Sequence, residues 1–106
     1  MWDDLDEMLV YAGESGALQL SGYDDCIVGI AERCSQGTLL VYDVDRVIEK
    51  LMSRDSMTYN EAQEFFQFNI AGAWMGEGTP LLFSQLAGPV EEAVRYKPEE
   101  DSDVKF

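Results

Sequence analysis

The 106-residue chain carries 21 acidic and seven basic residues and no histidine, so its net charge at pH 7 is -14. This charge disfavours direct binding to nucleic acid or to an anionic membrane surface, and the absence of histidine removes the commonest general base. The hydrophobic fraction of 46% exceeds that of disordered chains and suffices for one core. We therefore expect a single acidic globular domain over residues 1–97 and a disordered acidic tail over residues 98–106.

The first predicted element lies within residues 2–12. Trp2, Leu5 and Met8 recur at three-residue spacing, which indicates a short amphipathic helix. Acidic residues at its start would interact favourably with the helix dipole. The end of this stretch would also fit a strand, and we favour the helix. A short extended segment is expected at residues 17–21.

Two strands are predicted next, at residues 26–30 and 38–42. Both are rich in β-branched and apolar residues, and a polar stretch that contains Gly37 separates them. This pattern predicts an antiparallel hairpin. The nearly continuous apolar runs indicate that helices cover at least one face of the sheet.

A pair of helices follows the hairpin. Asp43 is the predicted N-cap of the first helix, and apolar residues recur at helical spacing from Val44 to Met52. The second helix begins at Thr58, because Thr58 and Glu61 form a T-x-x-E capping box. Only four residues separate the two helices, so we expect an antiparallel or sharply angled pair.

The second helix is predicted to bury a face that includes Phe66, Asn69 and Ile70. A buried Asn needs hydrogen-bond partners, so we predict that Asn69 bonds to the glycine-rich segment 72–78 or to a strand end. That segment ends the helix, since its glycines follow the helix and no Lys or Ser completes a phosphate-binding loop. Trp74 within it is predicted to be buried.

The last predicted strand spans residues 80–86. It should lie at a sheet edge, because Pro80 has no N–H to donate to a strand ladder. A further helical turn is expected at residues 88–96, with Pro89 at its start. Together these elements predict an α+β fold in which a small antiparallel sheet packs against a helix pair.

Neither a membrane segment nor a cofactor site is indicated. No apolar run approaches the roughly 20 residues of a membrane-spanning helix, and the first residues lack the basic region of a signal peptide. Cys26 and Cys34 lack the spacing of a structural zinc site, so we interpret them as structural thiols that are buried singly or as a pair. We expect a soluble cytoplasmic protein without a cofactor or bound metal.

The block from Asp24 to Phe83 resembles a family of small bacteriophage and prophage proteins. Members of that family share the pattern YDxD(R/K)VIExLMxRDxMTYxEAxEFFxFNxxGAWxGExTP, and the block covers about 60 of the 106 residues. Ser56 stands where the family pattern has Gly, so the turn is expected to be less tight. The resemblance implies a phage-type protein and no particular activity. The matching positions are Tyr42, Asp43, Asp45, Arg54, Asp55, Met57, Thr58, Glu61, Ala62, Phe66, Asn69, Gly72, Ala73, Gly76, Glu77, Thr79 and Pro80.

The resemblance and the charge together predict a non-catalytic protein that binds a basic host protein in the host cytoplasm. Carboxylates can occupy sites that Lys and Arg form for phosphates. Our hypothesis is therefore inhibition of a host restriction or CRISPR nuclease by nucleic-acid mimicry. The candidate partner-binding residues are carboxylates near the N-terminus, namely Asp3, Asp4, Asp6, Glu7, Asp24 and Asp25.

Two other classes of function stay open. A structural or assembly protein of a virion or complex would use an apolar patch, with Trp2, Trp74 or Phe83 exposed. A small enzyme or nucleotide-binding protein is disfavoured, since histidine is missing and basic residues are few. The many carboxylates identify no catalytic pair.

Overall fold

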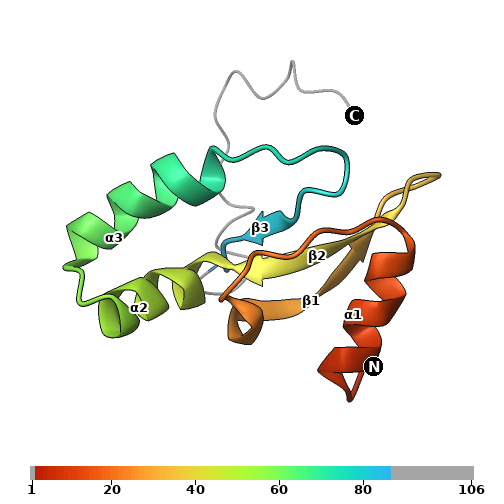
Figure 1. Cartoon of the computed structure of the whole chain (residues 1–106), viewed down its shortest axis with the longest axis horizontal. Helices are drawn as coiled ribbons and strands as arrows, with labels where there is room; N and C mark the ends of the chain where they lie inside the picture. Colours follow the sequence, from red (N-terminus) through yellow and green to blue (C-terminus); the bar gives the residue numbers. More distant parts are fainter. Residues whose placement is uncertain (1, 87–106) are drawn as a thin grey trace, which may run out of the picture.

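The computed structural model describes residues 2–86 of the chain. The helical turn predicted at residues 88–96, the acidic tail and the domain boundary at residue 97 lie outside them. The described residues form an α+β fold of helices around a three-stranded sheet (Figure 1). In chain order the elements are α1 (Leu5–Glu14), the 3₁₀ turn η1 (Asp24–Cys26), β1 (Ile27–Glu32), β2 (Thr38–Asp43), α2 (Val44–Arg54), α3 (Tyr59–Phe66), the π-helical turn η2 (Gln67–Ala71) and β3 (Leu81–Phe83).

The sheet has the order β1-β2-β3 and is mixed. The predicted hairpin of β1 and β2 is confirmed as antiparallel. β3 pairs with the other edge of β2, from Val41↔Leu81 to Asp43↔Phe83, and runs parallel to it. The prediction of a fully antiparallel sheet is therefore wrong for this strand. Parallel neighbours need a long crossover connection, and here α2, α3 and η2 provide it.

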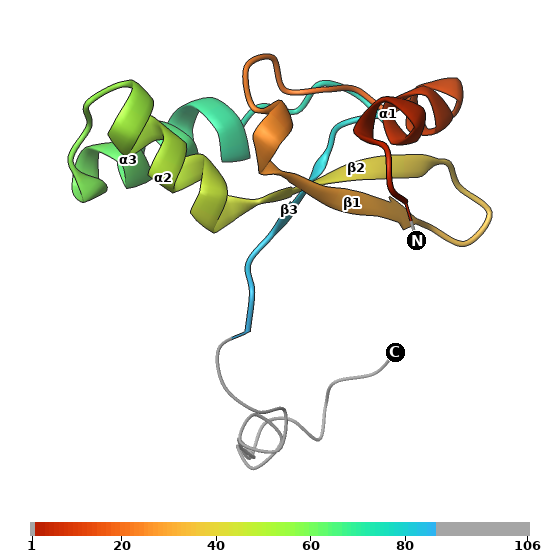
Figure 2. The same cartoon turned by 90° about the horizontal axis from the view of Figure 1, so that it is seen from below.

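The helices occupy two positions around the sheet. α1 lies over one face of the β1–β2 hairpin, whereas α2 and α3 extend from the opposite end of the sheet (Figure 2). The α1 helix predicted from spacing is confirmed. The segment predicted as extended at residues 17–21 forms no strand, but the N–H of Leu18 donates to the carbonyl of Gly78 over 2.9 Å. A side chain at Gly78 would collide with the carbonyl of Gly16, so this close approach requires glycine.

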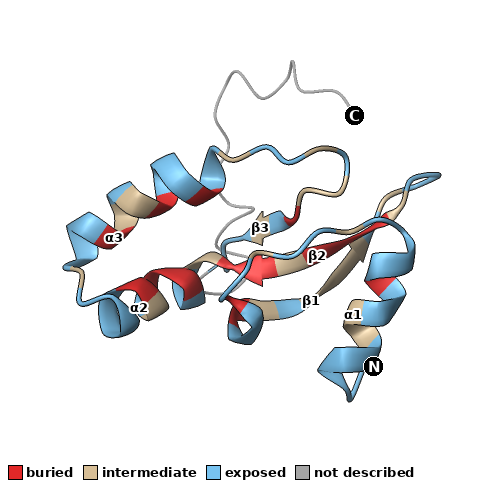
Figure 3. Cartoon of the chain, in the orientation of Figure 1, coloured by how far each residue is buried: buried red, intermediate tan, exposed pale blue. Residues whose placement is uncertain are grey.

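The core is centred on β2, which is paired on both sides and buried along most of its length (Figure 3). Tyr42 and Leu40 are completely buried there. Burial of each such side chain stabilises the fold by roughly 1.5–3 kcal/mol. The other buried members of the cluster come from every helix and turn, namely Ala12, Tyr23, Cys26, Val47, Ile48, Leu51, Ala62, Phe66 and Ile70.

The predicted helix caps are confirmed. The Asp43 carboxylate accepts from the N–H of Asp45 over 2.9 Å at the start of α2. At the start of α3 the N–H of Glu61 donates to the Thr58 hydroxyl, and the N–H of Thr58 donates to the Glu61 carboxylate over 2.9 Å. This reciprocal capping box satisfies two backbone donors that the helix itself leaves free.

The predicted environments of three side chains are wrong. Asn69 is exposed, because the wider π-helical turn η2 advances each residue by a smaller angle than the α-helical spacing assumes. Its amide donates to the carbonyl of Phe65 over 3.2 Å. Trp74 is 72% exposed in the loop after η2. The two cysteines are unpaired, and only Cys26 is buried, since Cys34 lies in the exposed turn between β1 and β2.

Ser56 adopts the left-handed conformation that glycine favours, with φ at 59°. This conformation is sterically unfavourable for a residue with a side chain, so the turn holds Ser56 under backbone strain. We expect Ser56→Gly to raise the free energy of unfolding by about 0.5–1 kcal/mol, because the relief of strain exceeds the added flexibility of the unfolded chain. Chemical denaturation measures this change.

Ser53 is the matched control, because it lies inside α2. Ser53→Gly should lower the free energy of unfolding by roughly 0.5–1 kcal/mol, as glycine does inside helices. Equal destabilisation by both substitutions would show that the turn does not strain Ser56.

Tyr42 also positions the loop that follows α1. The N–H of Leu20, which is partly buried, donates to the hydroxyl of the buried Tyr42 over 2.8 Å. Tyr42→Phe should therefore lower the free energy of unfolding by about 1–3 kcal/mol, because the Leu20 N–H loses its partner. Tyr11→Phe removes an exposed hydroxyl and should change stability by less than about 0.5 kcal/mol. Equal effects in thermal denaturation would contradict this assignment.

Candidate functional site

The six predicted acidic residues fall into two groups on different elements. Four lie at the start of α1 and are all exposed, namely Asp3, Asp4, Asp6 and Glu7. The Asp4 carboxylate is the N-cap of α1 and accepts from the N–H of Asp6 over 2.9 Å. Within residues 2–86 none of the four forms a salt bridge. This α1 group therefore presents uncompensated negative charge.

The other two residues, Asp24 and Asp25, lie in the 3₁₀ turn η1 and are exposed. Lys50 of α2 donates to both carboxylate oxygens of Asp25 over 2.8 Å. This hydrogen bond lowers the pKa of Asp25 below its ordinary value, and the charge of Lys50 adds to the effect. Asp25 is thus already paired within the molecule, whereas Asp24 has no salt-bridge partner among the described residues.

Cys26 is in contact with the paired carboxylate. Its thiol donates to Asp25 over 3.7 Å. Burial, and to a lesser extent the nearby charge of Asp25, raise the pKa of Cys26 to about 11. A thiol with such a pKa stays protonated at neutral pH, so the structure gives Cys26 a packing role and not that of a nucleophile.

The α1 group lies near the start of β1. Trp2, Asp3 and Asp4 line a small pocket of about 170 Å³ together with residues 27–29. η1 ends directly before Ile27, so the acidic residues of α1 and η1 flank the same few residues of β1. The α1 group therefore lies beside the strand that follows η1 along the chain.

The sequence analysis missed a basic face on α2. Arg46, Lys50 and Arg54 recur every four residues and line one pocket with Asp25. Four-residue spacing on a helix places side chains on one face, so this signal was present in the sequence. These three residues are most of the cations in residues 2–86, and each contacts an acidic residue.

Arg54 links this basic face to the loop before η1. Its guanidinium lies 4.9 Å from the centre of the Tyr23 ring, and it donates to the carbonyl of Gly22 over 3.1 Å. It also donates to both carboxylate oxygens of Asp55. The hydrogen bonds that Arg54 donates to Asp55 and to the Tyr23 hydroxyl raise the pKa of Arg54, that to Asp55 most strongly. The arginine therefore has a structural role in holding the loop against α2.

The outer face of α1 extends the acidic surface beyond the predicted residues. Glu14 lies two helical turns after Glu7, and both line a pocket with the exposed side chains of Val10 and Tyr11. Glu32 of β1 joins this face, because the Tyr11 hydroxyl donates to its carboxylate over 3.0 Å. The seven-residue spacing of Glu7 and Glu14 predicts that Glu14 lies on the same face of the helix. The position of Glu32 on this face depends on the tertiary contact between β1 and α1, which the sequence does not show.

Chemical groups typical of metal sites are not clustered in the part of the chain that the structure describes. Among residues 2–86, no group of three or more Cys, Asp or Glu side chains could hold a metal ion. No helix among these residues is long and apolar enough to span a membrane. The arrangement offers charged and apolar contact surfaces.

Comparison with known proteins gives no match to a family model, to a curated protein or to a solved structure. The resemblance of residues 24–83 to phage proteins stays a prediction.

Proposed function

We propose that the chain is a non-catalytic binding protein that docks through the acidic face of α1 onto a basic, nucleic-acid-binding surface of a partner protein. The supporting observation is the distribution of charge. The described basic residues on α2 are paired with carboxylates, whereas the carboxylates that begin α1 are exposed and have no salt bridge within residues 2–86. A surface of one sign steers association with a surface of the opposite sign.

The arrangement of the carboxylates suits a surface that binds a nucleic-acid backbone. Glu7 and Glu14 are separated by about 10–11 Å along the axis of α1, and Asp3 and Asp6 precede them in the same direction. Glu7 and Glu14 thus lie on one face of the helix, and Asp6 lies about 100° around the axis from Glu7. Lys and Arg side chains that bind phosphates also form charge-assisted hydrogen bonds with carboxylates.

The proposed partner class is a host defence nuclease, of the restriction or CRISPR type, in the bacterial cytoplasm. The resemblance to phage proteins supports this choice, because a phage gains from blocking such an enzyme. Occupation of the DNA-binding site by α1 would inhibit the nuclease without any reaction on this chain.

A charge-matched pair of variants tests the proposal. Asp3→Asn, Asp6→Asn and Glu7→Gln are combined in one variant, which keeps the Asp4 cap. The control variant combines Asp45→Asn, Glu49→Gln and Glu77→Gln, which removes the same charge from other exposed positions. Each immobilised chain is exposed to bacterial lysate, and the bound proteins are released by duplex DNA.

We expect DNA to release nucleic-acid-binding proteins from the natural chain and from the control variant. The α1 variant should retain at least about tenfold less of them, because the opposing cations lose their partners. Equal retention by both variants, or bound proteins that duplex DNA does not release, would refute docking through α1.

An assembly role is the second candidate, and three exposed aromatic residues favour it. Trp2, Trp74 and Phe83 are 40%, 72% and 42% exposed. Large exposed aromatic side chains are common at protein–protein contacts. Light scattering during gel filtration distinguishes this role. Self-association that Trp74→Ala removes would support assembly, and a monomer at every concentration would exclude self-assembly.

A further inference from the structure

Side chains of α3 and of the turn before it line an open groove. Figure 1 shows α3 at the end of the molecule opposite α1. The groove has a volume of about 750 Å³, which is larger than the other hollows described above. It starts at the turn between α2 and α3 and follows α3 into η2. The lining side chains that matter here are Asp55, Met57, Glu61, Glu64, Phe65 and Phe68.

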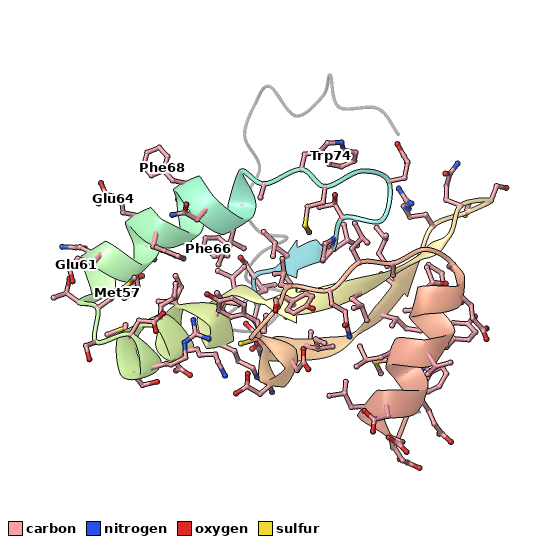
Figure 4. All side chains as sticks on the ribbon, in the orientation of Figure 1. Met57, Glu61, Glu64, Phe66, Phe68 and Trp74 are labelled. Carbon is pink, nitrogen blue, oxygen red and sulfur yellow. The ribbon has the colours of Figure 1, made fainter. Side chains whose placement is uncertain are left out.

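The apolar part of the groove consists of a floor of two partly buried side chains, Met57 and Phe65, and one exposed aromatic ring, that of Phe68. Met57 and Phe65 are partly buried and pack against the core, so their positions are fixed from below. Phe68 is 77% exposed, more than any other large hydrophobic residue described. Figure 4 shows its ring pointing away from the body of the molecule. An exposed phenylalanine beside a supported apolar floor is characteristic of a contact surface.

The position of Phe68 between two buried residues explains why Phe68 is so exposed. Phe66 and Ile70 are both buried, four residues apart, and η2 spans the residues between them. Phe68 lies midway and therefore faces outward. π turns inside helices occur frequently at functional sites. The fold thus buries one aromatic residue of this helix and presents the other.

The charged part of the groove is entirely negative among its described lining residues. Two of the carboxylates are held in place, since Arg54 donates to Asp55 and the cap N–H of Thr58 donates to Glu61. Glu64 has no salt bridge within residues 2–86, and Figure 4 shows it on the same side of α3 as Phe68. Fixed carboxylates around an apolar floor favour a basic ligand with an apolar side.

We infer that this groove binds a basic amphipathic helix of a partner protein. Apolar side chains of that helix would cover Phe68, Met57 and Phe65, and its flanking Lys or Arg side chains would face Glu61 and Glu64. Helices with one apolar face commonly bind in grooves of this kind, and methionine adapts well to their side chains. The inference concerns a surface separate from α1 and does not depend on the proposed function.

Charge selects this occupant over the alternatives. A second copy of the chain would bring another net charge of -14 to an acidic groove. The chain's own residues 98–106 carry four acidic residues and one Lys, so they would also add negative charge. A basic segment of another protein complements the groove.

The probe is a fluorescein-labelled peptide of Leu and Lys with Leu at helical spacing, and its scrambled isomer is the sequence control. Binding to the full chain is followed by fluorescence anisotropy. Phe68→Ala should weaken binding of the amphipathic peptide at least about tenfold, and Glu64→Gln about threefold. Phe83→Ala and Glu77→Gln are matched controls at exposed positions outside the groove, and should change the Kd less than about twofold.

Four outcomes would overturn the inference. These are equal affinity for the scrambled peptide, an unchanged Kd for Phe68→Ala, self-association of the natural chain that Phe68→Ala removes, and loss of peptide binding in the α1 variant Asp3→Asn/Asp6→Asn/Glu7→Gln. The last would place the peptide on α1. The groove and the α1 surface are each tested by separate substitutions. A negative result for the groove is therefore distinguishable from a negative result for the proposed function. Circular dichroism verifies that each variant is folded.

Discussion

Burial of β2 is the constraint on which the rest of the structure depends. This strand pairs with β1 on one side and β3 on the other, and Leu40 and Tyr42 contribute completely buried side chains to the core. Tyr42 also holds the loop after α1 through the N–H of Leu20. α2 begins directly where β2 ends, with Asp43 closing the strand and capping the helix. The position of each helix therefore follows from the placement of one strand.

Some charged side chains around this core form salt bridges within residues 2–86, and others do not. On α2 the cations are paired with nearby carboxylates, and Arg54 in addition holds the loop before η1. At α1 and at Glu64 the carboxylates have no such partner among the described residues. The carboxylates of the α1 group and Glu64 of α3 lie at opposite ends of the molecule.

Local signals in the sequence predict much of the fold. The T-x-x-E capping box, the N-cap Asp43 and the apolar spacing of α2 act within a few residues, so they can be read without the tertiary structure. The direction of β3 could not be predicted, because it depends on the path of about 40 intervening residues. The exposure of Asn69 could not be predicted either, because α-helical spacing does not describe the π-helical turn in which Asn69 lies.

The candidate site residues likewise differ in whether local sequence signals predict their environment. Acidic residues at the start of α1 were predicted as exposed, and helix geometry suffices for that. The pairing of Asp25 with Lys50 joins residues 25 positions apart, so composition alone could not reveal that this carboxylate is compensated. The groove combines side chains from a turn, an α-helix and a π-helix, and sequence spacing alone does not reveal such a combination.

The crossover between β2 and β3 has a consequence for the order of folding. The β1–β2 hairpin closes a short loop, whereas the pairing of Val41 with Leu81 closes one of about 40 residues, at a larger cost in chain entropy. β3 supplies only three residues to the ladder, so it joins late and separates first. Its separation uncovers the backbone donors and acceptors along one edge of β2. Unpaired strand edges recruit other chains, so those three residues protect the folded chain against strand exchange and aggregation.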